Sequence, residues 1–141
     1  MRVVLDTNTV ASGLLWEGIP SQLLSAAREH RIEIFTSAAL LAELSDVLPR
    51  DQFTRKIQAA GLSVAQLTFR YALLATQVIP ADIYPNILND PDDDAVLACA
   101  LAAQVDLIVS GDAHLLNLKH YHRIQIVSCA EALRLALAVN S

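Results

Sequence analysis

Short apolar runs, separated from one another by helical patterns, are the feature of this sequence that most constrains its fold. Arg2 to Leu5 and Asp106 to Ser110 have apolar centres made of Val, Leu and Ile. Runs of this kind are typical of parallel strands that are buried on both faces of a sheet. Ile32 to Phe35 and Arg123 to Val127 are similar β-branched runs, and Gln77 to Pro80 is a brief one. The sequence therefore predicts a buried parallel sheet of about five strands.

Helical patterns fill the stretches between these runs. They cover residues 9–16, 20–30, 38–48, 50–60, 63–76, 92–104 and 129–139. Pro20 suits a first helical turn, Gly61 separates two helices, and the proline- and asparagine-rich stretch from Ala81 to Pro91 predicts a loop. Strands that alternate with helices, without internal repeats, predict an α/β fold. We expect a three-layer α/β/α sandwich around a central parallel sheet, of the Rossmann-related kind.

Length and composition indicate a single globular domain over residues 1–141. A chain of 141 residues has the usual size of one domain and is long enough to bury a core. Hydrophobic residues make up 54% of it, in segments shorter than a membrane span, and its first residues lack the pattern of a signal peptide. We therefore expect a cytoplasmic protein that does not bind membranes. Cys99 and Cys129 have no metal-ligand spacing and are interpreted as small core residues.

Two acidic residues, Asp6 and Asp112, come directly after predicted strands. Either residue alone could be no more than the N-cap of a following helix or turn. In doubly wound sheets, however, ligands bind beyond the carboxyl ends of the strands, so two acids in these positions should converge on one crevice. We therefore interpret Asp6 and Asp112 as a pair that acts at this crevice.

A second concentration of acid lies between Asp90 and Asp94, where four of the five residues are carboxylates around Pro91. Acids in a first helical turn interact favourably with the helix dipole, but capping needs only one or two of them. Two unit charges about 4 Å apart repel by roughly 4 kcal/mol at an effective dielectric constant of 20, so a cation would relieve the cluster. Asp94, next to the apolar run of the predicted helix, is the expected ligand, and Asp92 and Asp93 compete with it.

Glu43 lies at the rim of the apolar face of the predicted helix 38–48. That face consists of Leu40, Leu41, Leu44, Val47 and Leu48. A carboxylate at such a rim needs a partner, whereas Asp46 lies farther out and is expected to be solvated. The pattern fits a metal ligand, and it fits a snorkelling or ion-paired Glu43 equally well.

These residues together resemble the PIN domain family, and in particular its bacterial and archaeal members grouped with VapC-type toxins. Val4 to Asn8 is similar to the first motif of the family, and Glu43 follows the second predicted strand as the family's second acid does. Asp94 to Ala100 is similar to the third motif and Val109 to Asp112 to the fourth. The resemblance covers nearly the whole chain.

The resemblance implies a metal-dependent endoribonuclease. Asp6, Asp94 and Asp112, together with Glu43, would surround one or two Mg²⁺ or Mn²⁺ ions, which bind oxygen ligands and activate water for in-line attack on an RNA phosphodiester. Glu43 would bind or orient that water. The expected products carry a 5′-phosphate and a 3′-hydroxyl.

The resemblance also implies accessory residues and partners. Asn8 and Ser110 are similar to polar positions that orient ligands or bound water, and Asp92 and Asp93 are accessory acids. Many relatives carry a further acid where this chain has His114, so a fifth ligand is not expected. The implied partners are single-stranded RNA, a small antitoxin that covers the site of a toxin, and a second copy of the chain in a homodimer formed by the middle helices.

The charge of the chain neither supports nor excludes an RNA substrate. The formal net charge is −5, whereas nucleic-acid-binding proteins usually present a basic face. Without the four candidate ligands, eleven acids remain against ten Lys and Arg. The basic groups that could contact phosphates are Arg50, Arg55, Lys56, Lys119, His120, His122 and Arg123. Charge on a solvated helix or loop is also ordinary.

Two other classes of protein fit parts of the pattern. Aspartyl-phosphate phosphohydrolases also carry an Asp after the first strand, but they need a second Asp two residues later, where this chain has Asn8. A non-catalytic module with the same fold could bind RNA or protein without cleaving it. Acids at all four motif positions favour the nuclease.

Overall fold

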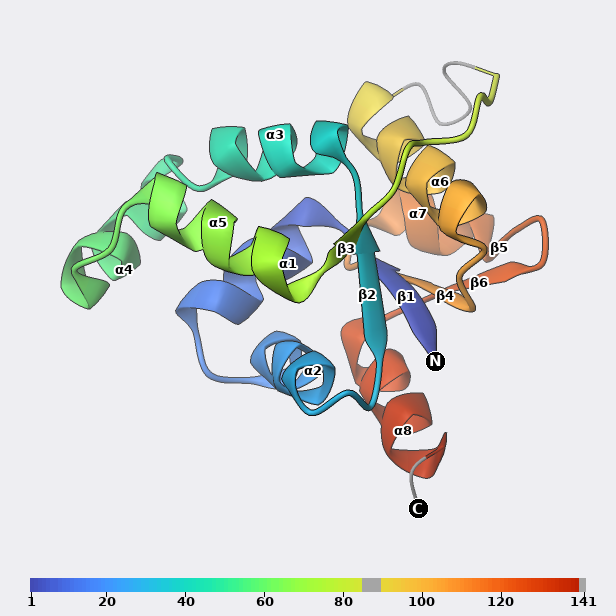
Figure 1. Cartoon of the computed structure of the whole chain (residues 1–141), viewed down its shortest axis with the longest axis horizontal. Coiled ribbons are helices and arrows are strands. Elements are labelled where there is room, and N and C mark those ends of the chain that lie inside the picture. The colour runs from blue at the N-terminus through green and yellow to red at the C-terminus, as the bar shows by residue number, and fades with distance from the viewer. Residues whose placement is uncertain (85–89, 140–141) are drawn as a thin grey trace.

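A single sheet, mostly parallel, lies at the centre of the fold. The structure, a computed structural model, describes residues 1–84 and 90–139. In these residues the strands are β1 (Arg2–Leu5), β2 (Glu33–Thr36), β3 (Thr76–Gln77), β4 (Leu107–Val109), β5 (His120–Tyr121) and β6 (Ile124–Val127). They pair in the order β3-β2-β1-β4-β6-β5, and only β5 is antiparallel to its neighbour among the described strands (Figure 1).

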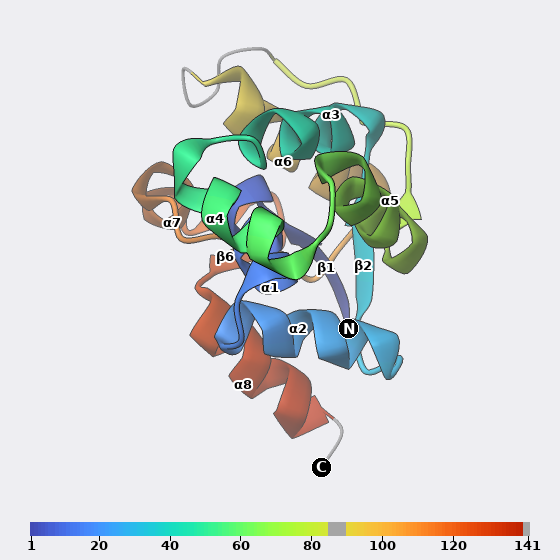
Figure 2. The same ribbon diagram turned by 90° about the vertical axis from the view of Figure 1, so that its left-hand side faces the viewer.

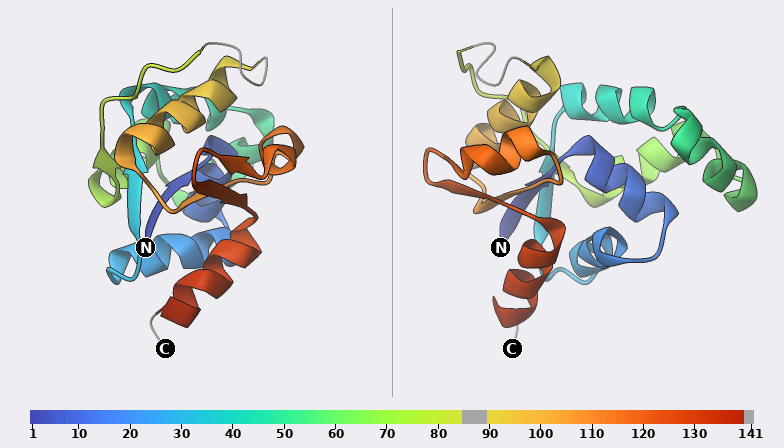
Figure 3. Two further views of the ribbon diagram at one scale, coloured as in Figure 1. Left: turned by 90° about the vertical axis from the view of Figure 1, so that its right-hand side faces the viewer. Right: turned by 180° about the vertical axis from the view of Figure 1, so that it is seen from behind.

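Helices cover both faces of this sheet. Those in the described residues are α1 (Thr7–Leu15), α2 (Ile19–Arg28), α3 (Ala38–Val47), α4 (Asp51–Ala60), α5 (Val64–Leu74), α6 (Pro91–Ala103), α7 (Ala113–Leu118) and α8 (Cys129–Val139). Figure 3 shows α6 on one side of the sheet and α2 and α8 on the other. This is the predicted α/β fold, a three-layer α/β/α sandwich.

Alternation along the central strand β1 divides the core into two parts. Val3 and Leu5 pack with residues of α1, α2, α5 and α8, whereas Val4 packs with residues of α6 and α7. Successive side chains of a strand point to opposite faces, so a fully apolar strand fills both cores. The fully apolar runs of the sequence therefore correspond to strands that are buried on both faces of the sheet.

The helices α3, α4 and α5 extend to one side of the sheet (Figures 1 and 2). Leu40 at the start of α3 belongs to the core under α6, and Leu44 one turn later belongs to the opposite core. Trp16, which follows α1, contacts Phe53 of α4 with 5.7 Å between ring centroids. These contacts fix α3 across the edge of the sandwich, close to the carboxyl ends of the strands.

Two short elements were not predicted from the sequence. The six residues of α7 are too few to show a helical period, and the two residues of β5 form a hairpin with β6 that local pattern does not reveal. The five predicted strands are all present as the parallel part of the sheet, and β5 adds a sixth, antiparallel strand at its edge. The brief strand expected at 77–80 is β3, at Thr76–Gln77, and part of the predicted loop 81–91, residues 85–89, lies outside the described residues.

In residues 1–84 and 90–139, every helix falls short of the length and apolar character that a membrane span requires.

We predict that Gly13→Ala destabilises the protein by about 1–3 kcal/mol, because the added carbon overpacks the contact between α1 and α2. An ideal Cβ at Gly13 would lie 2.9 Å from the Pro20 carbonyl oxygen and 2.9 Å from Leu24 Cδ1. Urea unfolding measures the change. Gly111→Ala is the control, since nothing lies within 4 Å of its Cβ position. A Gly13 variant as stable as the wild type would show that the two helices can separate without cost.

Candidate metal-binding site

The carboxyl ends of β1 and β4 bring Asp6 and Asp112 to the same edge of the sheet. Leu5 pairs with Val109 in register, and the Asp6 amide donates to the Val109 carbonyl at 3.0 Å. Ser110 is fully buried between the two acids. Its hydroxyl donates to Asp6 Oδ2 and accepts from the Asp112 amide at 2.9 Å. The strand pairing and this one hydroxyl therefore fix the two acids relative to each other.

Asp6 and Asp112 are also the N-caps of the helices that follow them. Asp6 Oδ1 accepts from the Thr9 amide at 2.9 Å at the start of α1, and Asp112 Oδ1 accepts from the His114 amide at 2.8 Å at the start of α7. The capping hydrogen bond involves only one of the two oxygens of each carboxylate. The capping interpretation and the ligand interpretation are therefore compatible, because each carboxylate has lone pairs that the cap does not use.

Asp93 is the buried acid of the site. It lies in the first turn of α6, is only 6% exposed, and its Oδ2 has no hydrogen-bond partner among the described residues. Burial, followed by the charges of Asp112 and Asp90, raises the pKa of Asp93 to about 7, against a smaller opposing effect of His114. A buried carboxylate oxygen without a donor is unfavourable, and a bound cation would satisfy it.

Asp93, Asp112 and His114 form a group with metal-ligand spacing. One potential ligand atom from each residue lies within 4.8 Å of the other two. The two carboxylates suit a hard divalent cation such as Mg²⁺ or Mn²⁺, which takes its remaining ligands from water and phosphate. The orphaned oxygen of Asp93 and this spacing together show that the residues present fit a divalent cation.

Glu43 reaches the same region from α3. Ser37 caps this helix by accepting from the Leu40 amide at 3.3 Å, which sets the direction of its first turns. Burial raises the pKa of Glu43, a hydrogen bond with the Thr7 side chain opposes the shift, and the charges of Asp92, Asp6 and Asp90 add to it. Glu43 and Thr7 line the same cavity as these acids.

These side chains line a cavity of about 200 Å³. Its lining consists of Asp6, Thr7, Asn8, Glu43, Arg50, Asp90, Asp92, Asp93, Val96 and Asp112. A second cavity, of about 410 Å³, shares Asp6, Asn8 and Asp112 with the first and continues toward Cys129 at the start of α8. The two cavities therefore meet along the carboxyl ends of β1 and β4.

The structure brings most of the expected site residues together. Asp6, Glu43, Asp112, Asn8, Asp92 and Asp93 all line the first cavity, and Ser110 lies beneath it. Asp94 is not part of this lining. It acts on Tyr121 instead, where its charge adds to a rise in pKa that is caused mainly by burial. Neighbouring helical residues point about 100° apart, and α6 is turned so that Asp92 and Asp93 line the cavity and Asp94 does not.

The structure therefore places Asp93 where the sequence interpretation had put Asp94. No signal in the sequence separates the two residues, because Asp93 is followed by Val96, Leu97 and Ala100 and Asp94 by Leu97, Ala98 and Leu101 at the same helical spacings of three, four and seven. The sequence predicts no fifth ligand, because this chain has His114 where many relatives carry an acid, whereas the fold brings His114 at the start of α7 beside Asp93 and Asp112. Thr7 lines the cavity without any sequence signal that assigns it there, and Arg50, one of several basic groups that the sequence offers as phosphate contacts, lines it too.

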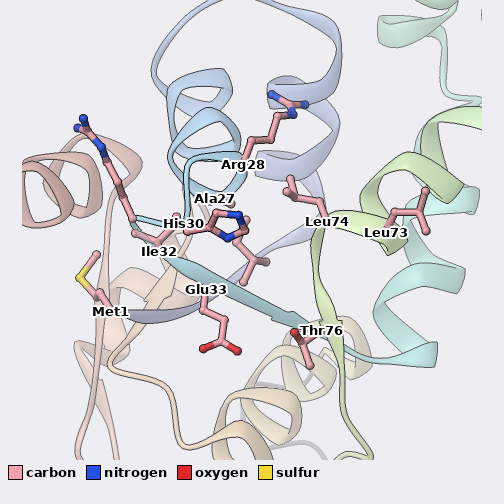
Figure 4. A pocket seen from close by; sticks show the side chains of 11 residues that line it. Met1, Ala27, Arg28, His30, Ile32, Glu33, Leu73, Leu74 and Thr76 are labelled. Atoms are coloured by element: carbon pink, nitrogen blue, oxygen red, sulfur yellow. The ribbon is translucent and has the colours of Figure 1, made fainter.

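A larger cavity, of about 670 Å³, lies at the opposite, amino-terminal end of the sheet, where Met1, His30 and Leu74 are among its lining residues (Figure 4). Glu33 is the one acid among the described residues that line it. It offers no cluster of ligands, so size does not identify the chemically active cavity here.

Comparison with known proteins gives one result for the family. A family model described as PIN domain matches residues 2–114, a range that includes Asp6, Glu43, Asp93 and Asp112. A comparison with curated proteins found no match for this chain.

We predict that Asp93→Asn stabilises the metal-free protein at pH 8 by about 1–3 kcal/mol. Asp93 has a folded-state pKa of about 7, above its ordinary value of 3.8, so its ionisation destabilises the folded state progressively as pH rises through this interval. The advantage of the variant should be small at pH 4 and reach its maximum above pH 7.

Urea unfolding in EDTA at several pH values measures this difference. Asp46→Asn is the matched control, since Asp46 is exposed on α3 and outside the cavity. A pH-independent difference between wild type and Asp93→Asn would contradict the assigned burial of this charge.

Proposed function

The chain belongs to the PIN domain family, and we propose that it is a Mg²⁺- or Mn²⁺-dependent endoribonuclease acting on single-stranded RNA. The fold is one that typically carries metal-dependent nucleases. The observation that carries the proposal is the buried Asp93 oxygen without a hydrogen bond, beside Asp112, in a cavity where six of the ten lining residues are acids. Capping accounts for Asp6, Asp90 and Asp112, but it does not account for this oxygen.

The residues have different roles in the proposed reaction. Asp6, Asp93 and Asp112 would hold the cation, with His114 within reach of the last two, and the Ser110 hydroxyl fixes Asp6 by donating a hydrogen bond to its Oδ2. When bound, the cation supplies charge stabilisation for the phosphate and activation of an attacking water. Glu43 orients that water and accepts its proton, a role favoured by its raised pKa.

The joined cavities support an extended substrate. They meet at Asp6, Asn8 and Asp112, so a strand lying across them would pass directly over the acids. An extended single strand could contact both cavities at once through its successive phosphates and bases. We propose hydrolysis of an internal phosphodiester, leaving a 5′-phosphate and a 3′-hydroxyl.

We further propose that the protein is the cytoplasmic toxin of a toxin–antitoxin pair. A small antitoxin would restrain it by covering the acidic cavity. The chain would form a homodimer through α3, α4 and α5, where Phe69 and Leu73 of α5 are 63% and 71% exposed. Large exposed apolar side chains in one region are typical of protein interfaces.

A non-catalytic RNA- or protein-binding module is the second candidate. The caps made by Asp6, Asp90 and Asp112 favour it, because a structural role alone would retain these acids. Titration with Mg²⁺ and Mn²⁺, followed by thermal unfolding, separates the candidates. A protein that is not stabilised by either ion at millimolar concentration would be a binding module.

We predict that pure protein cleaves labelled single-stranded RNA in Mg²⁺ or Mn²⁺ and that Asp6→Asn lowers the rate at least about 100-fold, since it removes an anionic ligand of the cation. EDTA should abolish cleavage, and Asp46→Asn should leave it unchanged. Equal cleavage by the wild type and Asp6→Asn would mean a contaminating nuclease or a wrongly assigned site.

We also predict that Asp93→Asn lowers cleavage at least about 100-fold, whereas Asp94→Asn lowers it less than about 10-fold. The two variants make the same chemical change one residue apart in α6, and only Asp93 lines the cavity. Single-turnover rates with excess protein compare them. A greater loss for Asp94→Asn would overturn the assignment of Asp93.

A further inference from the structure

Arg50 is the one cation among the described residues that line the acidic cavity. It lies between α3, which carries Glu43, and α4, and it is exposed to solvent. Its amide donates to the Val47 carbonyl at 3.0 Å, and its carbonyl accepts from the Phe53 amide at 2.9 Å. The backbone of Arg50 is therefore held firmly at the end of α3, at a constant place relative to Glu43.

The guanidinium of Arg50 makes no ion pair within 4 Å in the part of the chain that the structure describes. Some other cations of the chain do have partners. Arg31 pairs with Glu29 at 3.2 Å and Arg134 with Glu131 at 2.6 Å, while Lys56 lies over the ring of Trp16. Arg50 thus borders six carboxylates without neutralising any one of them by direct contact.

The charge of the cavity poses a problem for a polyanionic substrate. A single divalent cation leaves the six-acid lining with a net negative charge, and this charge repels every phosphate that does not contact the cation. A guanidinium presents several N–H donors in a plane that matches two phosphate oxygens, and it stays charged at all working pH values. Arg50 supplies this chemistry on the α3 side of the cavity, and the acids opposite keep its position electrostatically favourable.

We infer that Arg50 binds a backbone phosphate of the RNA next to the cleaved bond, on the α3 side of the cavity. This assignment rests on the proposed function. Arg50 is a substrate-binding residue in this role, and the metal ligands do not depend on it. The shared boundary of the two cavities directs the strand past Asp6 and Asp112, with Arg50 as its anchor in the first cavity.

Arg55 provides the matched control. It carries the same side chain, lies in α4, which begins directly after Arg50, and is exposed. It does not line the cavity, so the structure gives no support to the phosphate contact considered for it from the sequence. Arg55→Ala therefore removes the same charge from the same region without touching the site. Arg50→Lys keeps the charge and removes the planar donor pair.

The test has two parts. The first measures the affinity for a fluorescent single-stranded RNA with Ca²⁺ in place of Mg²⁺, and the RNA is verified to be intact afterwards. The second measures the kinetics of cleavage in Mg²⁺. Arg50→Ala should weaken RNA binding about 5- to 10-fold and lower the slope of log affinity against log salt by about 0.7, the value for one phosphate of a single strand. KM should rise in parallel while kcat changes less than about threefold. Arg50→Lys should recover part of the affinity, and Arg55→Ala should remain within about twofold of the wild type.

The outcomes separate this assignment from the proposed function. If the wild type cleaves RNA and Arg50→Ala behaves like Arg55→Ala, the assignment of Arg50 fails and the nuclease stands. If RNA binding depends on Arg50 but no metal-dependent cleavage occurs, the assignment stands and the nuclease fails. Absence of RNA binding by the wild type overturns both.

Discussion

Hydrogen bonding between the parallel strands β1 and β4 is the constraint on which both the core and the site depend. It aligns Leu5 with Val109, so that the next residues along each strand leave the sheet side by side. The apolar side chains of β1 fill two cores on opposite faces and hold the strand in the middle of the sandwich. Because parallel strands end at a common edge, Asp6 and Asp112 face the same space without any local sequence linking them.

The acids of the site have two consequences for the molecule. As N-caps, Asp6, Asp90 and Asp112 each accept a backbone hydrogen bond that starts a helix, and they stabilise the fold. Burial, with the charges of Asp112 and Asp90 added to it, raises the pKa of Asp93 to about 7, so its ionisation opposes folding. A cation bound among these carboxylates is expected to offset their repulsion. Stability and metal binding are therefore linked through Asp93.

The strands, most helices and the acids at the strand ends could be predicted from the sequence, because they depend on the local pattern of residues. Fully apolar runs identified the strands, helical periods identified most helices, and the strand-end positions of Asp6 and Asp112 predicted their convergence. Glu43 was found because the apolar face of its helix extends over several turns, which makes its angular position well defined. The choice between Asp93 and Asp94 could not be made from the sequence, because apolar residues follow both at the same helical spacings, and only the packing of α6 brings Asp93 into the lining of the cavity.

The sequence by itself determined the α/β class, the order of the elements and the acids that end the central strands, since each follows from short-range periodicity and turn chemistry. Only the tertiary structure decided that β5 adds a sixth strand, that α7 brings His114 beside Asp93 and Asp112, and that Arg50 enters the acidic cavity. These arrangements join segments far apart in the chain. Their geometry depends on how helices pack on the sheet, which a local pattern of residues does not encode.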